Sequence, residues 1–422
     1  MSVALLTDRY ELTMVQAAIA GGKADRPCVF EVFARHLPAG RRYGVVAGTA
    51  RVIEAIQDFR FTQDQLDYLS SEKIVDSKTL DWLANYRFTG NVSGYREGEI
   101  YFGNSPVLTV EGGFAEAVIL ETVILSILNF DSAVASAAAR MRSAAPNRFL
   151  AEMGSRRTHE QAAVSAARAA YLVGFDATSN LEAGAKYGIP TMGTSAHSFT
   201  LLHDSEDQAF EAQLKALGNN TTLLVDTFDV ERAVRKAVEL SNGEVGAVRL
   251  DSGDLVQSAI EVRALLDYLG ATKTKITVTS DLDEYTIAAL AQAPVNSYGV
   301  GTSLVTGSGH PTAGFVYKLV SHFDGEDWVD VAKKSVNKSS RGGKKSARRL
   351  IEAGKASREL IGSPSVGRDL QMDLMLEGVS KIQDQRAALQ SARKHHAAAL
   401  AELPASALRL SKGEPAIPSE FV

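Results

Sequence analysis

Between residues 149 and 304 the chain repeats one local design seven times. Each repeat has a short apolar stretch, a tip of polar, charged or glycine residues, and then a segment with helical periodicity. The apolar stretches are 149–153, 174–176, 189–192, 223–225, 247–250, 276–279 and 298–300. Apolar strands that alternate with helices are typical of a parallel sheet. Seven such units favour an α/β fold built as an irregular parallel barrel, and no G-x-G-x-x-G motif follows the first strand to suggest a dinucleotide-binding sheet.

The flanks of this repeat follow a different pattern. Glycines punctuate short alternating runs over residues 88–116, and alternation returns at 315–331 around a hairpin signal, Asp324-Gly325. We therefore predict a smaller α+β domain formed from the N- and C-terminal parts of the chain. The predicted divisions are 1–130 for the N-terminal α+β part, 131–312 for the barrel, 313–360 for strands and a basic loop that return to the first part, and 361–422 for a C-terminal helical extension.

The composition of the chain limits the classes of partner and the cellular location that we expect. The net charge of −5 gives no global basic field that would favour nucleic acid, and the single cysteine, Cys28, excludes a disulfide within one chain. The N-terminus lacks a basic region that would begin a signal peptide. The most apolar stretch, 114–130, carries Glu116 and Glu121 and is shorter than the ~20 residues needed to span a bilayer. We expect a cytoplasmic protein that binds neither nucleic acid nor membrane.

The strand tips predict the kind of site. In α/β barrels the chemistry lies at the carboxyl ends of the strands. The tips here combine arginines, hydroxyls, carboxylates and glycines, which together are typical of a phosphate and sugar site. No lysine ends a strand, which disfavours an unrelated phosphosugar enzyme such as an aldolase. The chain also lacks a histidine pair at i, i+4, so the sequence does not indicate a metal-only site.

Three tips carry the sharpest predictions. In VRLDSGDL, alternation places Arg249 and Asp251 on one face, where they form either a structural ion pair or a site in which Arg249 binds phosphate and Asp251 binds ribose hydroxyls or a Mg²⁺ shell. Gly299 and Gly301 would let backbone amides approach a phosphate. His197 follows the strand 189–192; a lone histidine is commonly structural, but this position makes it a catalytic candidate. The basic run 333–349 is either a solvated loop or a phosphate-binding segment.

Nine motifs along the chain resemble the nicotinate phosphoribosyltransferase family of type II phosphoribosyltransferases. They span residues 7 to about 345 in the family's order, and they read TDRYELTM, FEVFAR, EMGSRRTHEQA, GFDATSNLEAG, GTSAHS, VRLDSGDL, SDLDEY, YGVGTSL and the K-x-S-x-x-K run at 333–338. The resemblance implies an enzyme that joins nicotinate to phosphoribosyl pyrophosphate, forming nicotinate mononucleotide and pyrophosphate. It implies coupled ATP hydrolysis through a phosphohistidine, Mg²⁺, a role in NAD salvage, and a homodimer with shared active sites.

The family's residue roles carry over position by position. His197 would be the phosphorylated histidine, with Asp251 beside it as a catalytic residue. Apart from the family's motifs, we expect that Asp226 or Asp254 could orient its ring. Nicotinate would contact Tyr10 of the neighbouring protomer, Met153, Arg156, Asp176 and Thr191. The phosphoribosyl group would contact Arg249, Asp251, Ser280, Asp281, Gly299, Gly301 and Thr302. Pyrophosphate or the ATP phosphates would contact Arg35, Lys333 and Lys338.

One position departs from the family pattern. Related enzymes usually carry phenylalanine where this chain has Met153, so the aromatic sandwich around the pyridine ring is altered here. Two alternatives stay open. A nicotinamide phosphoribosyltransferase shares the fold and the histidine, and kinetics with both bases would distinguish it. A catalytically inactive nucleotide-binding relative is disfavoured by the presence of His197, Arg249 and Asp251.

Overall fold

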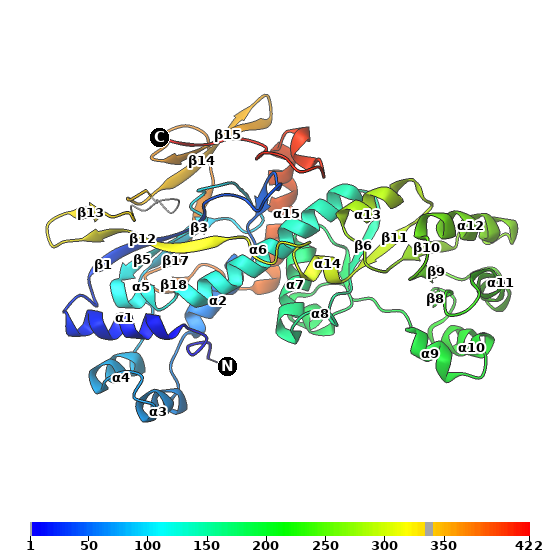
Figure 1. Ribbon diagram of the computed structural model, residues 1–422, viewed down its shortest axis with the longest axis horizontal. Helices are drawn as coiled ribbons and strands as arrows, with labels where there is room; N and C mark the ends of the chain where they lie inside the picture. Colours follow the sequence, from blue (N-terminus) through cyan, green and yellow to red (C-terminus); the bar gives the residue numbers. More distant parts are fainter. Residues whose placement is uncertain (1, 334–340) are drawn as a thin grey trace. The chain divides into compact units, whose positions relative to one another are not determined.

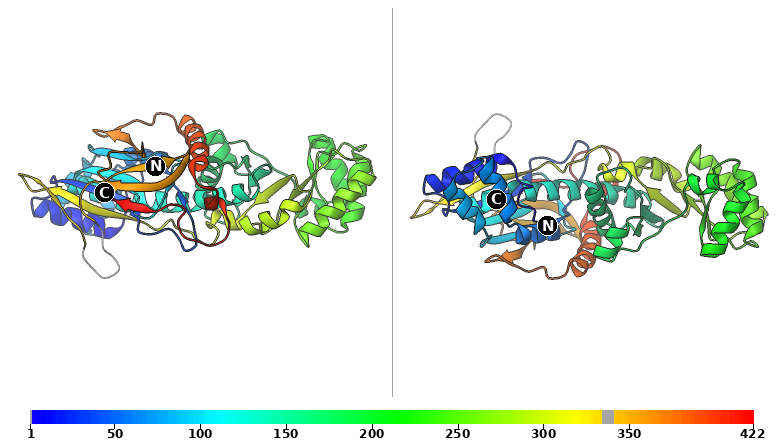
Figure 2. Two further views of the ribbon diagram at one scale, coloured as in Figure 1. Left: turned by 90° about the horizontal axis from the view of Figure 1, so that it is seen from above. Right: turned by 90° about the horizontal axis from the view of Figure 1, so that it is seen from below.

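The computed structural model describes residues 2–333 and 341–422 (Figure 1). The chain divides into two compact units. Unit 1 contains Met1–Ser136 and His310–Val422, and unit 2 contains Ala137–Gly309. Both ends of the chain therefore belong to unit 1 (Figure 2).

Unit 2 is built on a six-stranded sheet with the order β7-β6-β11-β10-β9-β8, in which every neighbouring pair is parallel. The strands are β6 (Phe149–Glu152), β7 (Ala177–Thr178), β8 (Thr222–Leu224), β9 (Ala247–Leu250), β10 (Lys275–Val278) and β11 (Ser297–Val300). Their central residues are apolar and inaccessible, as in Leu150, Leu223, Val248 and Ile276. The predicted parallel α/β architecture is confirmed.

The predicted strand at 189–192 contributes a single bridge. Thr191 pairs in parallel with Thr178 and so extends the sheet beyond β7. Among the described residues, no backbone pairing joins this stretch to β8 at the other edge. The gap is spanned by polar contacts, because His197 Nδ1 lies 3.2 Å from Thr227 Oγ1 and Arg249 Nη1 donates to the Ser195 carbonyl at 3.1 Å. The barrel is irregular because side chains replace a backbone ladder at this seam.

Helices follow the strands of unit 2. They are α7 (Glu160–Leu172), α8 (Leu181–Tyr187), α9 (His197–Leu202), α10 (Glu206–Leu217), α11 (Val230–Leu240), α12 (Leu255–Tyr268), α13 (Glu284–Ala289), η1 (Leu290–Gln292) and α14 (Thr302–Val305). Several polar tip residues are helix caps. The side chains of Asn180, Asp229, Asp254 and Asp283 accept backbone N–H bonds at the starts of α8, α11, α12 and α13. Some of the polar residues that follow the strands therefore act as helix N-caps.

Unit 1 contains antiparallel strands drawn from both ends of the chain. Its main sheet has the order β13-β12-β1-β5-β3-β17-β18. These strands are β1 (Pro27–Ala34), β3 (Asn91–Tyr95), β5 (Leu108–Gly113), β12 (Phe315–Phe323), β13 (Trp328–Asp330), β17 (Gln371–Leu376) and β18 (Val379–Ser380). Because β1 pairs with β12 and β3 pairs with β17, the two ends of the chain share one sheet, as the predicted fold requires.

Two smaller sheets and a set of helices complete unit 1. The sheets consist of β2 (Gly44–Val45) with β4 (Ile100–Tyr101), and of β14 (Ser346–Glu352), β15 (Lys355–Gly362), β16 (Arg368–Asp369) and β19 (Ser419–Phe421). The helices are α1 (Arg9–Ala20), α2 (Thr49–Asp58), α3 (Gln63–Ser71), α4 (Ser77–Ala84), α5 (Phe114–Val118), α15 (Gln385–Glu402) and η2 (Ala405–Leu408). Helix α6 (Glu121–Ala144) runs across the division between the units.

Two sequence expectations need revision here. The expected helical extension over 361–422 contains α15 but also β17, β18 and β19, so it is not wholly helical. Strand β17 exists because it pairs with β3, which is far away in sequence, and no local pattern reveals that partner. The stretch Phe114–Ala144 is also longer than expected: it is the one helical stretch among the described residues with the length and apolarity to cross a membrane, and 61% of its most apolar window is buried within the protein. Core helices of soluble proteins also meet that test.

Candidate active site

A cavity of about 230 Å³ opens at the carboxyl ends of β6, β9, β10 and β11. It is lined by Met153, Arg156, Arg157, Arg249, Asp251, Thr279, Ser280, Asp281, Gly299, Gly301 and Thr302. All of these except Arg157 and Thr279 were predicted as site residues from the sequence. Strands that are far apart in the sequence thus bring their carboxyl-terminal residues together at this cavity, which we call the mouth of the barrel. This is where α/β barrels carry their active sites.

Arg249 is fixed in this mouth by neutral partners. Its side chain is 12% exposed, Nε donates to Thr279 Oγ1 at 3.0 Å, and Nη1 donates to the Ser195 carbonyl at 3.1 Å. Its Nη2 lies 3.4 Å from Asp251 Oδ1, so the predicted proximity of the pair is confirmed. Because the other contacts of Arg249 are uncharged, its positive charge is only partly balanced by Asp251 and remains available to an anion.

His197 lies beside two carboxylates. Its Nε2 is 3.8 Å from Asp251 Oδ2 and 3.9 Å from Asp226 Oδ1, and its side chain is 40% exposed. The position of the imidazole next to the Arg249–Asp251 pair, on which the sequence interpretation depends, is therefore confirmed. Asp254 instead caps α12 by accepting the Gln257 N–H at 3.1 Å. Of the two candidates for orienting the ring, Asp226 is the one that faces it.

Only one of the two carboxylate oxygens of the buried Asp226 is hydrogen-bonded within the described residues. Its side chain is only 4% exposed. One oxygen, Oδ2, accepts the Asp251 backbone N–H at 2.7 Å and the Ser252 hydroxyl at 2.8 Å. The other, Oδ1, has no hydrogen-bond partner among the described residues. A buried acceptor without a partner is costly, so the oxygen that faces His197 is suited to a partner that arrives during the reaction.

The far wall of the mouth is shaped by a close approach at Gly299. A Cβ at this position would lie 2.5 Å from Met153 Sδ and 2.7 Å from Thr279 Cγ2, so only glycine fits. Ser280 has a φ of 119°, a conformation that a serine rarely adopts. Such strained backbone, costing about 1–3 kcal/mol, clusters at functional sites. Both residues line the cavity.

Glu152, at the end of β6, supports the arginine loop. It is fully buried, accepts the Thr178 hydroxyl and the Gly154 backbone N–H, and burial raises the pKa of its carboxyl group. The loop that follows carries Arg156 and Arg157, both exposed at the cavity, and no hydrogen bond or ion pair within the described residues occupies either guanidinium. Glu152 and Thr178 thus set the start of a loop that offers two unengaged cations.

One predicted base-pocket residue lies elsewhere. Asp176 precedes β7, and its carboxylate binds Arg142 at 2.6 Å and the Leu150 backbone N–H at 2.8 Å. These contacts lie at the amino ends of β6 and β7, whereas the cavity lies at the carboxyl ends of the strands. The prediction for Asp176 was wrong because the strand begins at Ala177 instead of ending at Asp176. Thr191 is exposed beside β7 and does not line the cavity.

The remaining predicted residues belong to unit 1. Tyr10 is on α1 and is 44% exposed, and Arg35 directly follows β1. Burial and the nearby Glu121 raise the pKa of the Tyr10 hydroxyl, which therefore stays protonated. Lys333 is exposed, and Lys338 lies outside the described residues. Their predicted contacts with phosphates stay predictions.

Sequence reasoning missed Thr279, Arg157 and Glu152 as part of this site. Thr279 ends the strand 276–279 and shares the inward face of the tip, so the alternation used for Arg249 would have selected it. Arg157 neighbours Arg156 in the same tip. Glu152 carries no such signal, because a glutamate inside a strand is recognised as useful only when its buried partners are known.

Together, the parallel barrel and its cationic, glycine-lined mouth with a histidine and two carboxylates define an α/β-barrel enzyme of the phosphosugar-handling class. Comparisons with known proteins then narrow the family. The nicotinate phosphoribosyltransferase (NAPRTase) N-terminal domain matches residues 5–129, and the NAPRTase family matches residues 149–387.

Individual relatives agree with these matches. Nicotinate phosphoribosyltransferase pncB1 of Mycobacterium tuberculosis (strain ATCC 25618 / H37Rv) is 53% identical over 434 residues, covering 99% of this chain and 95% of that protein. Nicotinate phosphoribosyltransferase of Bacillus subtilis (strain 168) is 38% identical over 83% of this chain and 74% of its own. The crystal structure of human nicotinic acid phosphoribosyltransferase superposes with a TM-score of 0.84 at 26% identity, covering 98% of both chains. This chain belongs to the nicotinate phosphoribosyltransferase family.

Proposed function

We propose that this protein is a nicotinate phosphoribosyltransferase. Nicotinate, phosphoribosyl pyrophosphate, ATP and water would give nicotinate mononucleotide, pyrophosphate, ADP and phosphate, in cytoplasmic NAD salvage. The proposal draws on family membership and on one observation above all, which is that His197 Nε2 lies 3.8 Å from Asp251, itself the partner of Arg249. The Asp251 carboxylate therefore lies beside both His197, the proposed phosphate acceptor, and Arg249, which is proposed to bind the phosphoribosyl group.

His197 would accept the γ-phosphoryl group of ATP. A ring nitrogen attacks the γ-phosphorus, the bond from that phosphorus to the bridging oxygen breaks, and ADP leaves. The ring gains positive charge as the new bond forms, and Asp226 and Asp251 stabilise that charge because they lie 3.9 and 3.8 Å from Nε2. Water later takes the phosphoryl group and returns the histidine to its free state.

The phosphoribosyl group would occupy the cavity between Arg249 and Gly299. Arg249 binds phosphate oxygens, the backbone around Gly299 and Gly301 approaches them closely, and the Asp251 carboxylate accepts ribose hydroxyls. Ser280, Asp281 and Thr302 also line this cavity. The C1′–pyrophosphate bond breaks through an oxocarbenium-like state while the pyridine nitrogen bonds to C1′, so catalysis depends on holding the two groups in line.

Nicotinate would place its carboxylate against Arg156, whose guanidinium offers a planar pair of donors. Met153 would pack against the pyridine ring, and Thr191 would lie at the edge of the base site. In the proposed homodimer, Tyr10 of a second copy stacks on the ring. Arg35, Lys333 and Lys338 of that copy would bind pyrophosphate or ATP phosphates.

Mg²⁺ fits this mouth as a companion of the substrate phosphates. No group of three or more histidine, cysteine or acidic side chains within 2–333 and 341–422 could enclose a metal ion. Magnesium is commonly bound by one or two carboxylates together with phosphates. Asp251, with the unpartnered oxygen of Asp226 nearby, would hold it, and the ion would neutralise charge on the departing pyrophosphate.

The test is incubation of the protein with γ-labelled ATP. We expect acid-labile label on the wild type and none on His197→Ala, because the label would be held as an acid-labile phosphoramidate on the His197 ring. His203→Ala is the matched control: His203 follows α9 and bonds to Phe199 O at 2.8 Å, away from the carboxylates, so label should remain. Equal labelling of His197→Ala would refute the phosphohistidine.

Base specificity is read in a separate assay. We expect mononucleotide formation from nicotinate, and at least tenfold lower kcat/KM with nicotinamide, because loss of a charge-assisted bond to Arg156 costs about 1.5–3 kcal/mol. A preference for nicotinamide would replace the proposed substrate while leaving the phosphoribosyl chemistry intact.

A further inference from the structure

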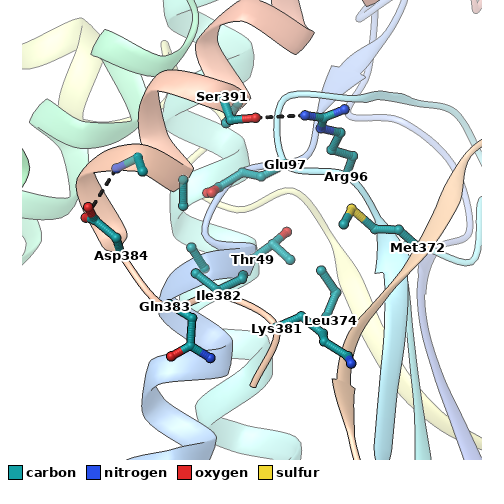
Figure 3. Close-up of a pocket in the computed structure, with 14 residues that line it drawn as sticks. Thr49, Arg96, Glu97, Met372, Leu374, Lys381, Ile382, Gln383, Asp384 and Ser391 are labelled. Carbon is teal, nitrogen blue, oxygen red and sulfur yellow. Dashed lines mark hydrogen bonds between the residues drawn. The ribbon is translucent and has the colours of Figure 1, made fainter. Parts of the chain in front are cut away.

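Unit 1 has a cavity of its own, of about 390 Å³, formed by α15, the segment leading into it, β17 and the start of α2 (Figure 3). Every residue that lines it belongs to unit 1. The volume lies within the range of pockets that take small molecules, which are mostly apolar with a few placed polar groups. Nothing in the proposed reaction uses these residues.

Part of the cavity wall is apolar. Figure 3 shows Met372 and Leu374 of β17 on one side and helix α15 on the other. Helix α15 contributes the alanines Ala387, Ala388 and Ala392 to the lining. Alanines leave room for a flat group, and a methionine sulfur packs favourably against an aromatic ring. The shape and the methionine favour a planar aromatic body.

A buried hydroxyl at the cavity lacks a partner. Thr49, the first residue of α2, lines the cavity and is 1% exposed. Its Oγ1 has no hydrogen-bond partner among the described residues. Because an unsatisfied buried hydroxyl is costly, a polar atom on a bound ligand would stabilise this site.

The carboxylates at the cavity are already bound by backbone groups. Glu97 Oε1 accepts the Gly48 N–H at 2.6 Å. Asp384 caps α15 by accepting the Arg386 N–H at 2.8 Å and the following N–H at 3.3 Å. Both negative charges are thus engaged in holding the ends of helices.

The cations at the cavity are less engaged. Lys381 is exposed, and its side-chain ammonium has no hydrogen-bond or ion-pair partner among the described residues. Arg96 is also exposed, and one of its nitrogens, Nη2, donates to Ser391 Oγ at 2.7 Å (Figure 3). The remaining donors of the guanidinium can bind an anion. The rim therefore favours a negatively charged ligand.

We propose that this cavity is a second ligand site, which binds a small aromatic monocarboxylate. The ring lies between Met372 and the alanines of α15, and the carboxylate binds Arg96. A hydroxyl or ring heteroatom at the meta position reaches Thr49 Oγ1. Binding at this site does not require the phosphoribosyl transfer proposed for unit 2.

The experiment is calorimetric titration of the full chain with benzoate and with 3-hydroxybenzoate. We expect 3-hydroxybenzoate to bind about tenfold more tightly than benzoate, because its hydroxyl satisfies Thr49. Thr49→Val, which keeps the shape of the side chain, should remove this preference without weakening benzoate. Arg96→Gln should weaken both ligands about tenfold, and Ala388→Phe, which fills the cavity, should abolish binding of both.

Two control variants establish whether the ligands bind in this cavity. Lys394→Gln changes an exposed lysine of the same helix that does not line the cavity, and it should leave both affinities unchanged. Arg156→Ala removes the cation proposed for the base site of unit 2 and should also leave this binding unchanged. The proposal is overturned if the wild type binds neither ligand at about 1 mM, if Ala388→Phe (folded by circular dichroism) still binds, or if Arg156→Ala alone removes binding.

Discussion

At the scale of single residues, the mouth of the barrel depends on the hydroxyl of Thr279. It accepts from Arg249 Nε at 3.0 Å and donates to Asp251 Oδ1, so one side chain orients both members of the proposed phosphosugar pair. The Arg249–Asp251 contact itself is looser, at 3.4 Å. The orientation of the pair therefore comes from the shared hydroxyl more than from direct attraction between the charges.

We predict that Thr279→Val lowers kcat/KM for phosphoribosyl transfer by about ten- to a hundredfold, because hydrogen bonds to two charged groups are lost at about 1.5–3 kcal/mol. The β-branched shape is kept, so the barrel should remain folded. Thr277→Val is the matched control. Thr277 is two residues earlier on β10 and bonds to Ser297 Oγ at 2.7 Å, away from the mouth, so activity should stay within about twofold. Equal losses in both variants would point to general damage to β10 instead.

At the scale of elements, strand position decides which site residues the sequence can predict. The strand 247–250 was predicted where β9 lies, so alternation correctly placed Arg249 and Asp251 together. The strand at 174–176 was misplaced, because β7 has only two residues and its position is set by pairing Ala177 with Ala151 on β6, which is not a local signal. The same limit hides β17. Long apolar strands with capped helices are therefore predictable, whereas short strands defined by distant partners are not.

Asp254, which the sequence left as an alternative to Asp226 for orienting the His197 ring, caps helix α12 instead. We predict that Asp254→Ala lowers the apparent midpoint of thermal unfolding by about 2–4 °C, because loss of an N-cap costs about 1 kcal/mol. Asp254→Asn should be nearly neutral, since asparagine caps equally well, and both variants should retain His197 labelling. In Asp226→Asn the outcome differs: the labelling rate should fall, because the charge that faces the imidazole is removed. Loss of labelling in Asp254→Asn would contradict this division of roles.

At the scale of the whole molecule, unit 1 is held together by contacts between the two ends of the chain. Arg349 is fully buried and binds Glu99 and Glu359, each at 2.6 Å. These partners lie in the N-terminal and C-terminal parts of the sequence. A buried cation between two carboxylates stabilises only when every member is present, so this network specifies how the ends assemble more than it adds net stability. Sequence patterns predicted strands over 88–116 and 315–331, but neither β17, β18 and β19 nor this ion pairing.

Helix α15 makes a second contact of this kind, and that contact is sensitive to pH. His396 is 3% exposed, its Nδ1 lies 3.0 Å from the Gly98 carbonyl, and its Nε2 has no partner among the described residues. Nδ1 therefore carries the proton and donates it to Gly98, and Nε2 is bare. Burial lowers the pKa of His396 from 6.5 to about 4, because a second proton would place an unpaired charge in the interior.

The pKa of His396 gives the sign of the pH effect. Between pH 6.5 and about 4 the unfolded chain binds a proton at this residue and the folded chain does not, so stability falls as the pH falls. At pH 5 the loss is about 2 kcal/mol relative to neutral pH. We predict that His396→Asn, whose amide can still donate to Gly98, removes this part of the pH dependence, so its unfolding midpoint falls less between pH 7.5 and 5 than that of the wild type. His203→Asn, which replaces a partly exposed histidine with the same kind of backbone bond, should keep the wild-type slope. Parallel slopes for the wild type and His396→Asn would show that the acid sensitivity arises elsewhere.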